Sequence, residues 1–529
     1  MESRLNDDFK PLHDRPSQLV HRYFEELMRL TYEYPELMSQ LVKVVGISSL
    51  ALMSAPWWSN GLSAGTSLVA IAIGATGAVA TGASWFMQNK FYGYPIDDDQ
   101  QVYEEVKFFW QSAKAKMILE SHALPRIQIE AEKPYDAGYV EGYMLGEAIR
   151  HTLAMTNFLY TPMRLMGAPS SKSDMMNYLH AVYNKIPQRY HEEMQGKIAG
   201  YNDWLQKQDP NAEPLTLEYY LLLQLLPDIR NYNPFATKSR NDEAISDVVS
   251  SNIQPACTTI ALRLGEYTFV TRVLDWPSYG DCGRYFLQVD RRIGDAVRTI
   301  DIGIPLLSGA LTVLNGSGLM IEMNVAHGDK IEEPNGMPAV FFNRFCAENA
   351  TCVSDIEMLI ANESPLGAYH LTASDGNEVR SFHFYQHPHV RGEHAVDALV
   401  RDEVSPQVLV VANHGLEYKN SVAEVDNHRD SDQRKANIHY FFSNKQVQNS
   451  FTDFIKQQHA AMKMPAEKLQ QMKEFCLQVA RLPLVSNRDS VLCALYVYHH
   501  KALIEASVAT DNLYAQKRDL SEFRSLKVI

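Results

Sequence analysis

The second half of this chain, from residue 257 onward, is crowded with short runs that are typical of β-strands. These runs are rich in β-branched and aromatic side chains and are broken by Gly, Asn or Pro: CTTIALRL, YTFVTRVLDW, RYFLQVDRR, GALTVLNGSGLMIEMNVA, HVRGEHAVDALVRDE and PQVLVVANHG. A helical stretch, NGMPAVFFNRFCAENATCVSDIEMLIANE, lies between them, and SVLCALYVYHHKALIEASVAT predicts two strands around a turn at His499-His500-Lys501. Strands in this density, with helices grouped between them, predict a layered α+β fold.

Before residue 257 the pattern favours helices. The stretch QQVYEEVKFFWQSAKAKMILE (100–120) is amphipathic at helical spacing. The stretch 135–158 carries Gly138, Gly142 and Gly146 at every fourth position, which indicates close packing against a neighbouring helix. QRYHEEMQGKIAGYNDWL and LTLEYYLLLQLLPDI predict two further helices. We therefore expect a mainly helical part ahead of the strand-rich half.

The composition divides the chain into three parts. Residues 1–90 form an N-terminal helical extension with an apolar hairpin, 91–256 are the mainly helical part, and 257–529 are the strand-rich part. The polar, acidic stretch 240–254 predicts a linker that proteolysis can reach. In the extension, the two apolar runs within 41–86 favour membrane association, because the second is about 20 uncharged residues long. A buried or peripheral hairpin in a soluble protein is the alternative.

Charge and cysteine content exclude some classes of function. The net charge of −14, without a clustered Lys/Arg stripe, argues against nucleic acid as a partner. The six cysteines lack the paired short spacing of a zinc site, so we expect neither metal nor cofactor, and they do not establish disulfides. No signal peptide is visible, so localisation stays open, with membrane association favoured over the cytoplasm.

Cys257 stands at the head of the first strand, and a hairpin brings charged groups beside it. If Gly265-Glu266 form a two-residue turn, Cys257 faces Leu274. Arg272 and Asp275 then flank the cysteine, although their different parity requires a bulge or a strand end at one of them. A nearby cation lowers the pKa of a thiol, so Cys257 is a candidate nucleophile.

The sequence near Cys257 contains no histidine to act as its base. A distant one, His327 or His414, would have to be brought there by the fold. Cleavage of the chain before Cys257 would supply another base, because a free α-amine has a pKa of about 7.7–8.0. Asp275 would then hold the amine. A buried structural cysteine is the alternative interpretation.

Four motifs in order around Cys257 resemble a known family. The first motif consists of CTT at 257–259 and RVLDW at 272–276. The other three are NGSGLMIEMN at 315–324, ANHG at 412–415 and SDQR at 431–434. Together they resemble the N-terminal-nucleophile (Ntn) cysteine hydrolases, which include acid ceramidase, N-acylethanolamine acid amidase, isopenicillin N acyltransferase and bile salt hydrolases. The resemblance covers about 127–442. It implies a four-layer αββα sandwich, no cofactor, and self-cleavage between Ala256 and Cys257 into two fragments that stay together as a heterodimer.

The resemblance also implies roles for individual residues. Cys257 would be the nucleophile both in self-cleavage and in turnover, and its own amine would be the base. Asp275 would orient that amine, and Arg272 would stabilise the thiolate or position the substrate carbonyl.

Three later residues complete the set that the resemblance implies. Asn413 would donate to the tetrahedral oxyanion, and Asn324 would form a hydrogen bond near the amine or the oxyanion. Arg434 would support the site by ion pairing.

The implied reaction is hydrolysis of a carbon–nitrogen bond in a linear amide, through an acyl-enzyme on Cys257. The apolar hairpin favours a lipid-like substrate, such as a fatty-acyl amide or a ceramide. Acyl transfer to an amine and a phospholipase B-like esterase are alternative enzymes. A membrane-tethered binding protein that keeps the fold without processing is the alternative outside enzymes.

Overall fold

The computed structural model describes residues of one compact unit, Ile96–Ile529. The described residues are 104–119, 124–153, 156, 172–225, 227–228, 256–276, 283, 285–326, 336–384, 394–399, 405–414, 429–460, 465–482, 485, 490–510 and 524–525. The predicted hairpin in 41–86 and the predicted linker 240–254 lie outside these residues. Within them, no helix combines the length and the apolar character that crossing a membrane requires.

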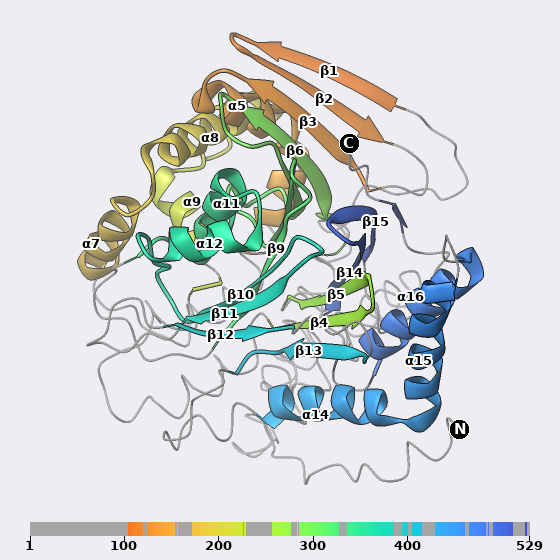
Figure 1. Ribbon diagram of the computed structural model, residues 1–529. Coiled ribbons are helices and arrows are strands. Elements are labelled where there is room, and N and C mark those ends of the chain that lie inside the picture. The colour runs from red at the N-terminus through yellow and green to blue at the C-terminus, as the bar shows by residue number, and fades with distance from the viewer. Residues whose placement is uncertain are drawn as a thin grey trace, which may run out of the picture. The chain divides into compact units, whose positions relative to one another are not determined.

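Two sheets dominate the described part of the chain (Figure 1). The large sheet has the order β1-β2-β3-β6-β7-β8-β9-β10-β11-β12 and is antiparallel except for the parallel pair β3–β6. Its strands are β1 (Glu104–Trp110), β2 (Ala113–Leu119), β3 (Arg126–Ala131), β6 (Leu287–Ile293), β7 (Thr299–Gly303), β8 (Thr312–Asn315), β9 (Met320–Val325), β10 (Tyr369–Ser374), β11 (Val379–Phe384) and β12 (His394–Ala398).

The small sheet carries the predicted nucleophile and has the order β13-β4-β5-β14-β15-β16. Its strands are β4 (Ala256–Leu264), β5 (Tyr267–Asp275), β13 (Gln407–Val411), β14 (Ser490–His499), β15 (Ala502–Thr510) and β16 (Arg524–Ser525). The two sheets meet face to face where β4 packs on β9. This contact places the head of β4 between the sheets.

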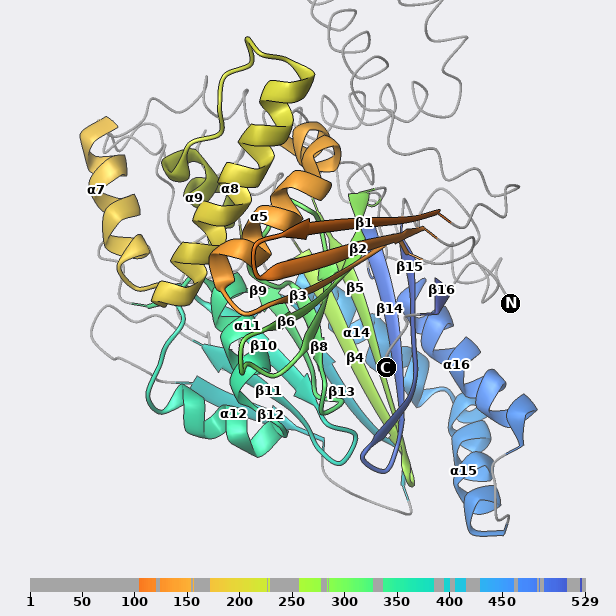
Figure 2. The same cartoon turned by 90° about the horizontal axis from the view of Figure 1, so that it is seen from above.

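Helices cover the outer faces of both sheets (Figure 2). On the large sheet, α5 packs on β1–β3, α8 packs on α5, and α11 packs on β7–β9. On the small sheet, α14, α15 and α16 pack on β13, β4 and β5 respectively. The helices are α5 (Pro134–Met144), α7 (Lys172–Tyr183), α8 (Gln188–Gln208), α9 (Leu217–Gln224), α11 (Ala339–Asn349), α12 (Val353–Ile360), α14 (Arg429–Ser443), α15 (Lys445–Ala460) and α16 (Ala466–Ala480). The prediction of a mixed fold of sheets and helices is confirmed.

The glycine stripe of α5 packs as predicted, against α8. A Cβ built on Gly138 would lie 2.0 Å from the carbonyl oxygen of Glu193, and one on Gly142 would lie 2.0 Å from that of Lys197. Gly196 of α8 meets the carbonyl oxygen of Tyr135 equally closely. Because backbone touches backbone, any side chain at these positions would force the two helices apart.

Charged side chains are buried where α5, α8 and α11 meet β6. Lys197 Nζ lies 2.6 Å from Glu141 Oε1, Arg291 Nη2 lies 2.9 Å from the same oxygen, and Arg344 Nη2 lies 2.7 Å from Glu193 Oε2. Burial alone raises the pKa of Glu141, but the cations of Arg291 and Lys197 reverse this and lower it overall. The network ties the helical layer to the large sheet.

One sequence prediction is wrong: the stretch 100–120 is not a helix. Residues 104–119 form the hairpin β1–β2, which continues the large sheet beyond β3. Side chains of β2 alternate, with Ala113 and Ala115 buried and Lys114 exposed, which is the period of a strand. Gln111 takes the turn with φ 45°, although the sequence has neither Gly nor Pro there. The part ahead of residue 257 therefore contributes strands as well as helices.

Candidate active site

The hairpin β4–β5 has the register that the sequence predicted. Gly265 takes the turn with φ +59°, Leu264 pairs with Tyr267, and Cys257 pairs with Leu274. A left-handed conformation of this kind favours glycine. The prediction of a two-residue turn at Gly265-Glu266 is confirmed.

The end of β5 is irregular, as the parity of Asp275 required. On β14, Leu492 pairs with Leu274, but Ser490 rather than Val491 pairs with Asp275, so the register shifts there. Ser490 Oγ donates to Asp275 Oδ1 at 2.6 Å, and both side chains are buried. Asp275 itself pairs with Ala256, the residue before the predicted cleavage point. Asp275 therefore lies across the hairpin from the residue that precedes the predicted cleavage point, and its negative charge acts on Cys257.

The thiol of Cys257 is buried and contacts a guanidinium. Arg272 Nη2 lies 3.6 Å from Cys257 Sγ, and Arg272 is itself wholly buried. Its other contacts are with oxygens: Nη1 donates to Leu311 O and to Thr312 Oγ1, both at 2.5 Å, and Nη2 donates to Met323 O at 2.7 Å. These oxygens fix the guanidinium plane, so the cation is held against the sulfur.

The backbone of Cys257 is held by two other predicted residues. Cys257 N donates to Asn413 Oδ1 at 3.1 Å, and Arg434 Nη1 donates to Cys257 O at 2.8 Å. Arg434 Nη2 also donates to Asn413 Oδ1 at 2.5 Å, and Nη1 donates to Thr258 Oγ1 at 2.6 Å. Arg272, Asn413 and Arg434 therefore contact the thiol, the N–H and the carbonyl of one residue.

The amide of Asn413 is already engaged on both sides. Its Nδ2 donates to Val325 O at 2.6 Å, while its Oδ1 accepts from Cys257 and Arg434. The Nδ2 group carries a second hydrogen, and the oxyanion role that the resemblance implies would use that one while Val325 O keeps the first. In this uncut chain, Asn413 anchors the Cys257 N–H.

Asn324 is linked to Cys257 indirectly, through the chain that leads to Asn413. Its Nδ2 donates to Val411 O at 3.0 Å and to Ala412 O at 3.3 Å, so it supports the strand end that leads to Asn413. The hydroxyl of Thr259 lies 3.1 Å from Asn324 Oδ1 and also donates to Glu322. Asn324 therefore holds the chain that leads to Asn413, and these contacts do not include the thiol.

Sequence reasoning missed Thr259, Glu322, Ser431 and Ser490. Ser431 Oγ accepts from Asn413 N at 2.8 Å. Burial raises the pKa of Glu322, and the nearby cation of Arg272 opposes this shift. A signal was present for three of them: Ser431 begins the SDQR motif, Thr259 lies two positions after Cys257, and Glu322 lies two before Asn324, so the last two share a strand face with a predicted residue.

The environment of Cys257 keeps its thiol protonated in the uncut chain. Burial raises the pKa of Cys257, the cation of Arg272 lowers it, and the negative Asp275 raises it again; the net direction is upward. The N–H of Val325 also bonds the sulfur and lowers the pKa. Arg272 and Val325 therefore offset only part of the rise in the pKa of Cys257 that burial causes.

Histidine does not supply the base within the described residues. His414 Nδ1 lies 2.7 Å from Ser431 Oγ and its Nε2 lies 3.0 Å from Asp432 Oδ1, and His327 lies outside the described part. The partners found for the Cys257 sulfur there are Arg272 and Val325. A base for this thiol must therefore come from elsewhere.

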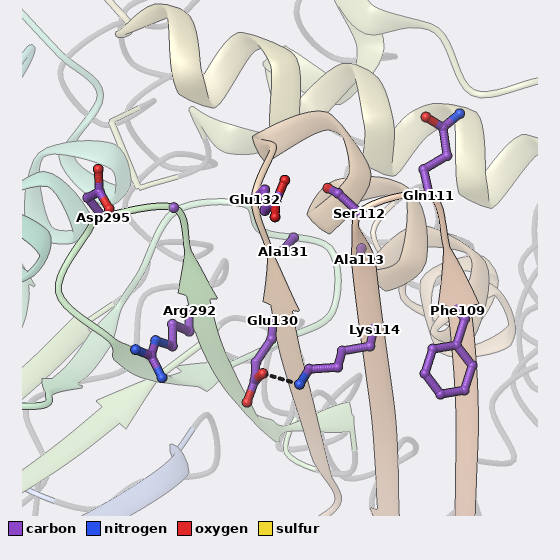
Figure 3. A pocket seen from close by; sticks show the side chains of 11 residues that line it. Phe109, Gln111, Ser112, Ala113, Lys114, Glu130, Ala131, Glu132, Arg292 and Asp295 are labelled. Carbon is purple, nitrogen blue, oxygen red and sulfur yellow. Dashed lines mark ion pairs between the residues drawn. The ribbon is translucent and has the colours of Figure 1, made fainter.

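A hollow of about 650 Å³ lies at another place, on the edge of the large sheet (Figure 3). Phe109, Lys114, Glu130 and Arg292 are among the residues that line it, and Lys114 Nζ pairs with Glu130 Oε2 at 2.5 Å. None of the predicted site residues lines this hollow. We place the candidate site at Cys257 because the chemically useful groups converge there.

Comparisons with known proteins add distant likenesses. No family model matches the chain, and no curated protein matches it. Among solved structures, it is similar to a Caenorhabditis elegans N-acylethanolamine-hydrolyzing acid amidase ortholog, with 14% identity, a TM-score of 0.32, and coverage of 46% of this chain and 94% of that one. It is also similar to two mutant forms of conjugated bile acid hydrolase from Clostridium perfringens. These have 11% and 10% identity and TM-scores of 0.28 and 0.27, and the matches cover 51% of this chain in both cases and 96% and 97% of theirs. Identities and TM-scores this low carry no argument about the family or the activity of this chain.

Proposed function

We propose that this chain is a self-processing cysteine Ntn amidohydrolase, with a helix–sheet–sheet–helix sandwich as its catalytic part. The observation that carries the proposal is the convergence on Cys257: Arg272 contacts its sulfur, Asn413 its N–H and Arg434 its carbonyl. A merely structural cysteine needs no partners, because a buried thiol packs as a small apolar group. Cys346 illustrates this case, since it is buried and burial alone raises its pKa.

The first reaction is self-cleavage. Cys257 Sγ attacks the carbonyl carbon of Ala256, a C–S bond forms, and the Ala256–Cys257 C–N bond breaks as the thiol proton passes to the departing amine. Water then hydrolyses the thioester, which leaves a carboxylate on Ala256 and restores the Cys257 thiol. Arg272 assists by stabilising negative charge on the sulfur, and Arg434 and Asn413 hold the backbone of Cys257 in place for the attack.

Self-cleavage supplies a base at Cys257, where the described residues place no histidine on the sulfur. The new α-amine of Cys257 has a pKa near neutral pH and lies on the nucleophile's own residue. Asp275, which pairs with Ala256 across the hairpin and is fixed by Ser490, is placed to hold the charged amine. The two fragments, 1–256 and 257–529, remain together because β3 of the first pairs with β6 of the second.

In turnover, the thiol attacks the carbonyl of a linear N-acyl amide. The acyl group moves to sulfur, the leaving amine takes a proton from the α-ammonium group, and water releases the acid. We propose a fatty-acyl amide or ceramide-like substrate, on the basis of the apolar runs in 41–86. Membrane contact through those runs is part of the same proposal.

Intact-mass analysis of the purified chain tests the proposal. Wild-type protein should give two masses, the second beginning at Cys257, whereas Cys257→Ser and Cys257→Ala should slow or abolish the cut. Cys352→Ser is the matched control, because it makes the same change at a half-buried cysteine that caps α12 far along the chain. A chain that stays whole at neutral and acidic pH in every variant would contradict self-processing and favour a binding protein.

Processed protein should then be given matched substrates. Release of free acid from an N-acyl amide, faster than from the ester with the same acyl chain, would support an amidase. Preference for the ester would favour the phospholipase B-like alternative. Formation of a new amide with an added amine would favour the acyltransferase alternative.

A further inference from the structure

Two turns of the small sheet lie together at the end opposite Cys257. The β4–β5 turn contributes Glu266, His499 ends β14, and His500 follows it in the turn to β15. Seven residue steps separate Cys257 from the last residue of β4, which is about 23 Å along a strand at about 3.3 Å per residue. The cluster of these three side chains is therefore remote from the candidate active site.

The three side chains present their ligand atoms to one another. Glu266 Oε2 lies 3.3 Å from His499 Nε2 and 3.3 Å from His500 Nε2, and the three atoms all lie within 4.8 Å of one another. Tetrahedral zinc with bonds of about 2.0–2.1 Å to nitrogen and oxygen has ligand–ligand separations of about 3.3–3.4 Å. The two carboxylate–imidazole distances match two edges of such a site.

The backbone holds the two turns in this arrangement. His500 N donates to Glu266 O at 2.9 Å, and the His499 ring lies 4.6 Å from the ring of Tyr267, its partner across the strands. Gln458 of α15 bonds the same turn, because its Oε1 accepts from Glu266 N at 2.9 Å. The backbone of both turns is thus held by strands and a helix before any ion binds.

His500 adds a sign of strain. Its φ is 53°, in the left-handed region that a non-glycine residue adopts at some cost. In this conformation the imidazole of His500, on the β14–β15 turn, lies 3.3 Å from the carboxylate of Glu266 on the β4–β5 turn. Glycine or asparagine would relieve the strain and would lose the third ligand.

We propose that Glu266, His499 and His500 form a Zn²⁺ site, with water in the fourth position. Two imidazoles and one carboxylate suit zinc, whereas Mg²⁺ and Ca²⁺ prefer oxygen ligands alone. The side chains are 39% to 51% exposed, so a fourth position is open to solvent. The ion would clamp the two turns and would add stability to the folded chain by mass action.

The proposal is independent of self-processing and can be tested in a chain that stays uncut. Cys257→Ala protein, freed of metal with a chelator and dialysed, is titrated with zinc chloride by calorimetry. We expect one equivalent of Zn²⁺ to be lost, or its Kd to rise at least tenfold, in Glu266→Gln, His499→Gln and His500→Asn. Asparagine suits the last position because it tolerates a left-handed backbone. His180→Asn is the control, since His180 is an exposed histidine at the end of α7.

Two further measurements separate this site from other zinc ligands in the chain. Zn²⁺ should raise the unfolding temperature of the parent and of His180→Asn, but not that of the three cluster variants, and Mg²⁺ at the same concentration should change none of them. Co²⁺ should give the intense visible absorption of a four-coordinate complex in the parent and in His180→Asn, but not in the three cluster variants. Absence of zinc binding, or equal binding and equal thermal shifts in the parent and all three variants, would overturn the proposal.

Discussion

The two faces of the hairpin β4–β5 have opposite characters. The face toward α14–α16 carries Ile260, Leu262 and Phe269, which belong to one apolar core cluster with these helices. The face toward the large sheet carries Thr259, Arg263 and Arg272, which are buried equally deeply but bond to named oxygens. Because side chains alternate along a strand, one stretch of sequence builds both a core and a site.

The comparison teaches that burial alone does not identify a core. Both faces are removed from water, but the first is stabilised by apolar area and the second by hydrogen bonds that fix polar groups in one geometry. Changes on the helix-facing side should therefore alter stability alone, and changes at sheet-facing residues that contact Cys257 or its supporting residues should alter chemistry at Cys257. The predictions below test this division.

The largest effect is expected from truncating the apolar face. Phe269 is fully buried, with its ring 6.3 Å from that of Phe454, so Phe269→Ala should lower the free energy of unfolding by about 3–5 kcal/mol. Denaturant unfolding in a Cys257→Ala background measures this loss. In the background that keeps Cys257, the folded fraction should still cut itself at the wild-type rate. Slower self-cleavage in fully folded protein would contradict the prediction that the helix-facing side affects stability alone.

The next effect concerns the cation at the thiol. Arg272→Gln removes the group that lowers the pKa of Cys257, so self-cleavage should slow by about tenfold to a hundredfold, the equivalent of about 1.5–3 kcal/mol. Time-resolved mass analysis gives the rate, and Arg272→Lys should recover part of it.

Arg263→Gln is the matched control for Arg272. Arg263 is also buried on the sheet-facing side, but its Nη2 donates to Gly376 O and Asn377 O instead of contacting the thiol. It should cost stability and leave the cleavage rate of folded protein unchanged. Equal slowing by both variants would mean that Arg272 acts through folding alone.

A third prediction concerns the effect of low pH on the face of the large sheet that meets the small sheet. In that sheet Asn324 pairs with His370, which pairs with His383, so a polar row runs from the site into β11. Burial, together with the positive charges of Lys435 and His414, lowers the pKa of His383 to about 3.

Because the folded-state pKa of His383 is depressed, its stabilising contribution is present above the unfolded pKa of about 6.5 and falls as the pH drops. The loss should be about 1.4 kcal/mol per pH unit, or about 2 kcal/mol at pH 5. Unfolding curves of Cys257→Ala protein with and without His383→Gln measure it as a difference. An unchanged pH slope would show that His383 is protonated in the folded protein.

Most strands could be predicted because β-branched and aromatic residues recur between Gly, Asn and Pro. The hairpin β1–β2 could not, because Glu, Lys and Gln dilute its pattern and its Gln111 turn lacks glycine. Its pairing with β3, a contact between separate segments, decides its structure. Propensity within one segment does not contain that information.

The same limit applies to the site. Turn chemistry and strand parity were enough to place Arg272 and Asp275 beside Cys257, because all three lie in one hairpin. Asn413 and Arg434 lie more than a hundred residues away along the chain and came only from the family resemblance. The buried ion network around Glu141 gave no sequence signal, since its members come from three helices and a strand.

The smallest effect comes from exchanging isosteric side chains between the two faces. Thr259→Val removes a hydroxyl that donates to Glu322, whose other oxygen, Oε2, has no hydrogen-bond partner among the residues that the structure describes. Val273→Thr places a hydroxyl in the apolar cluster. Each should lower the free energy of unfolding by about 1–3 kcal/mol, because each leaves a buried polar group unpaired. The two changes have opposite effects on hydrophobicity, so a stabilising Thr259→Val would show that this face depends on apolar area after all. Only Thr259→Val should also slow self-cleavage. It alone removes a hydrogen bond to Asn324, which bonds Val411 at the end of β13, two residues before Asn413.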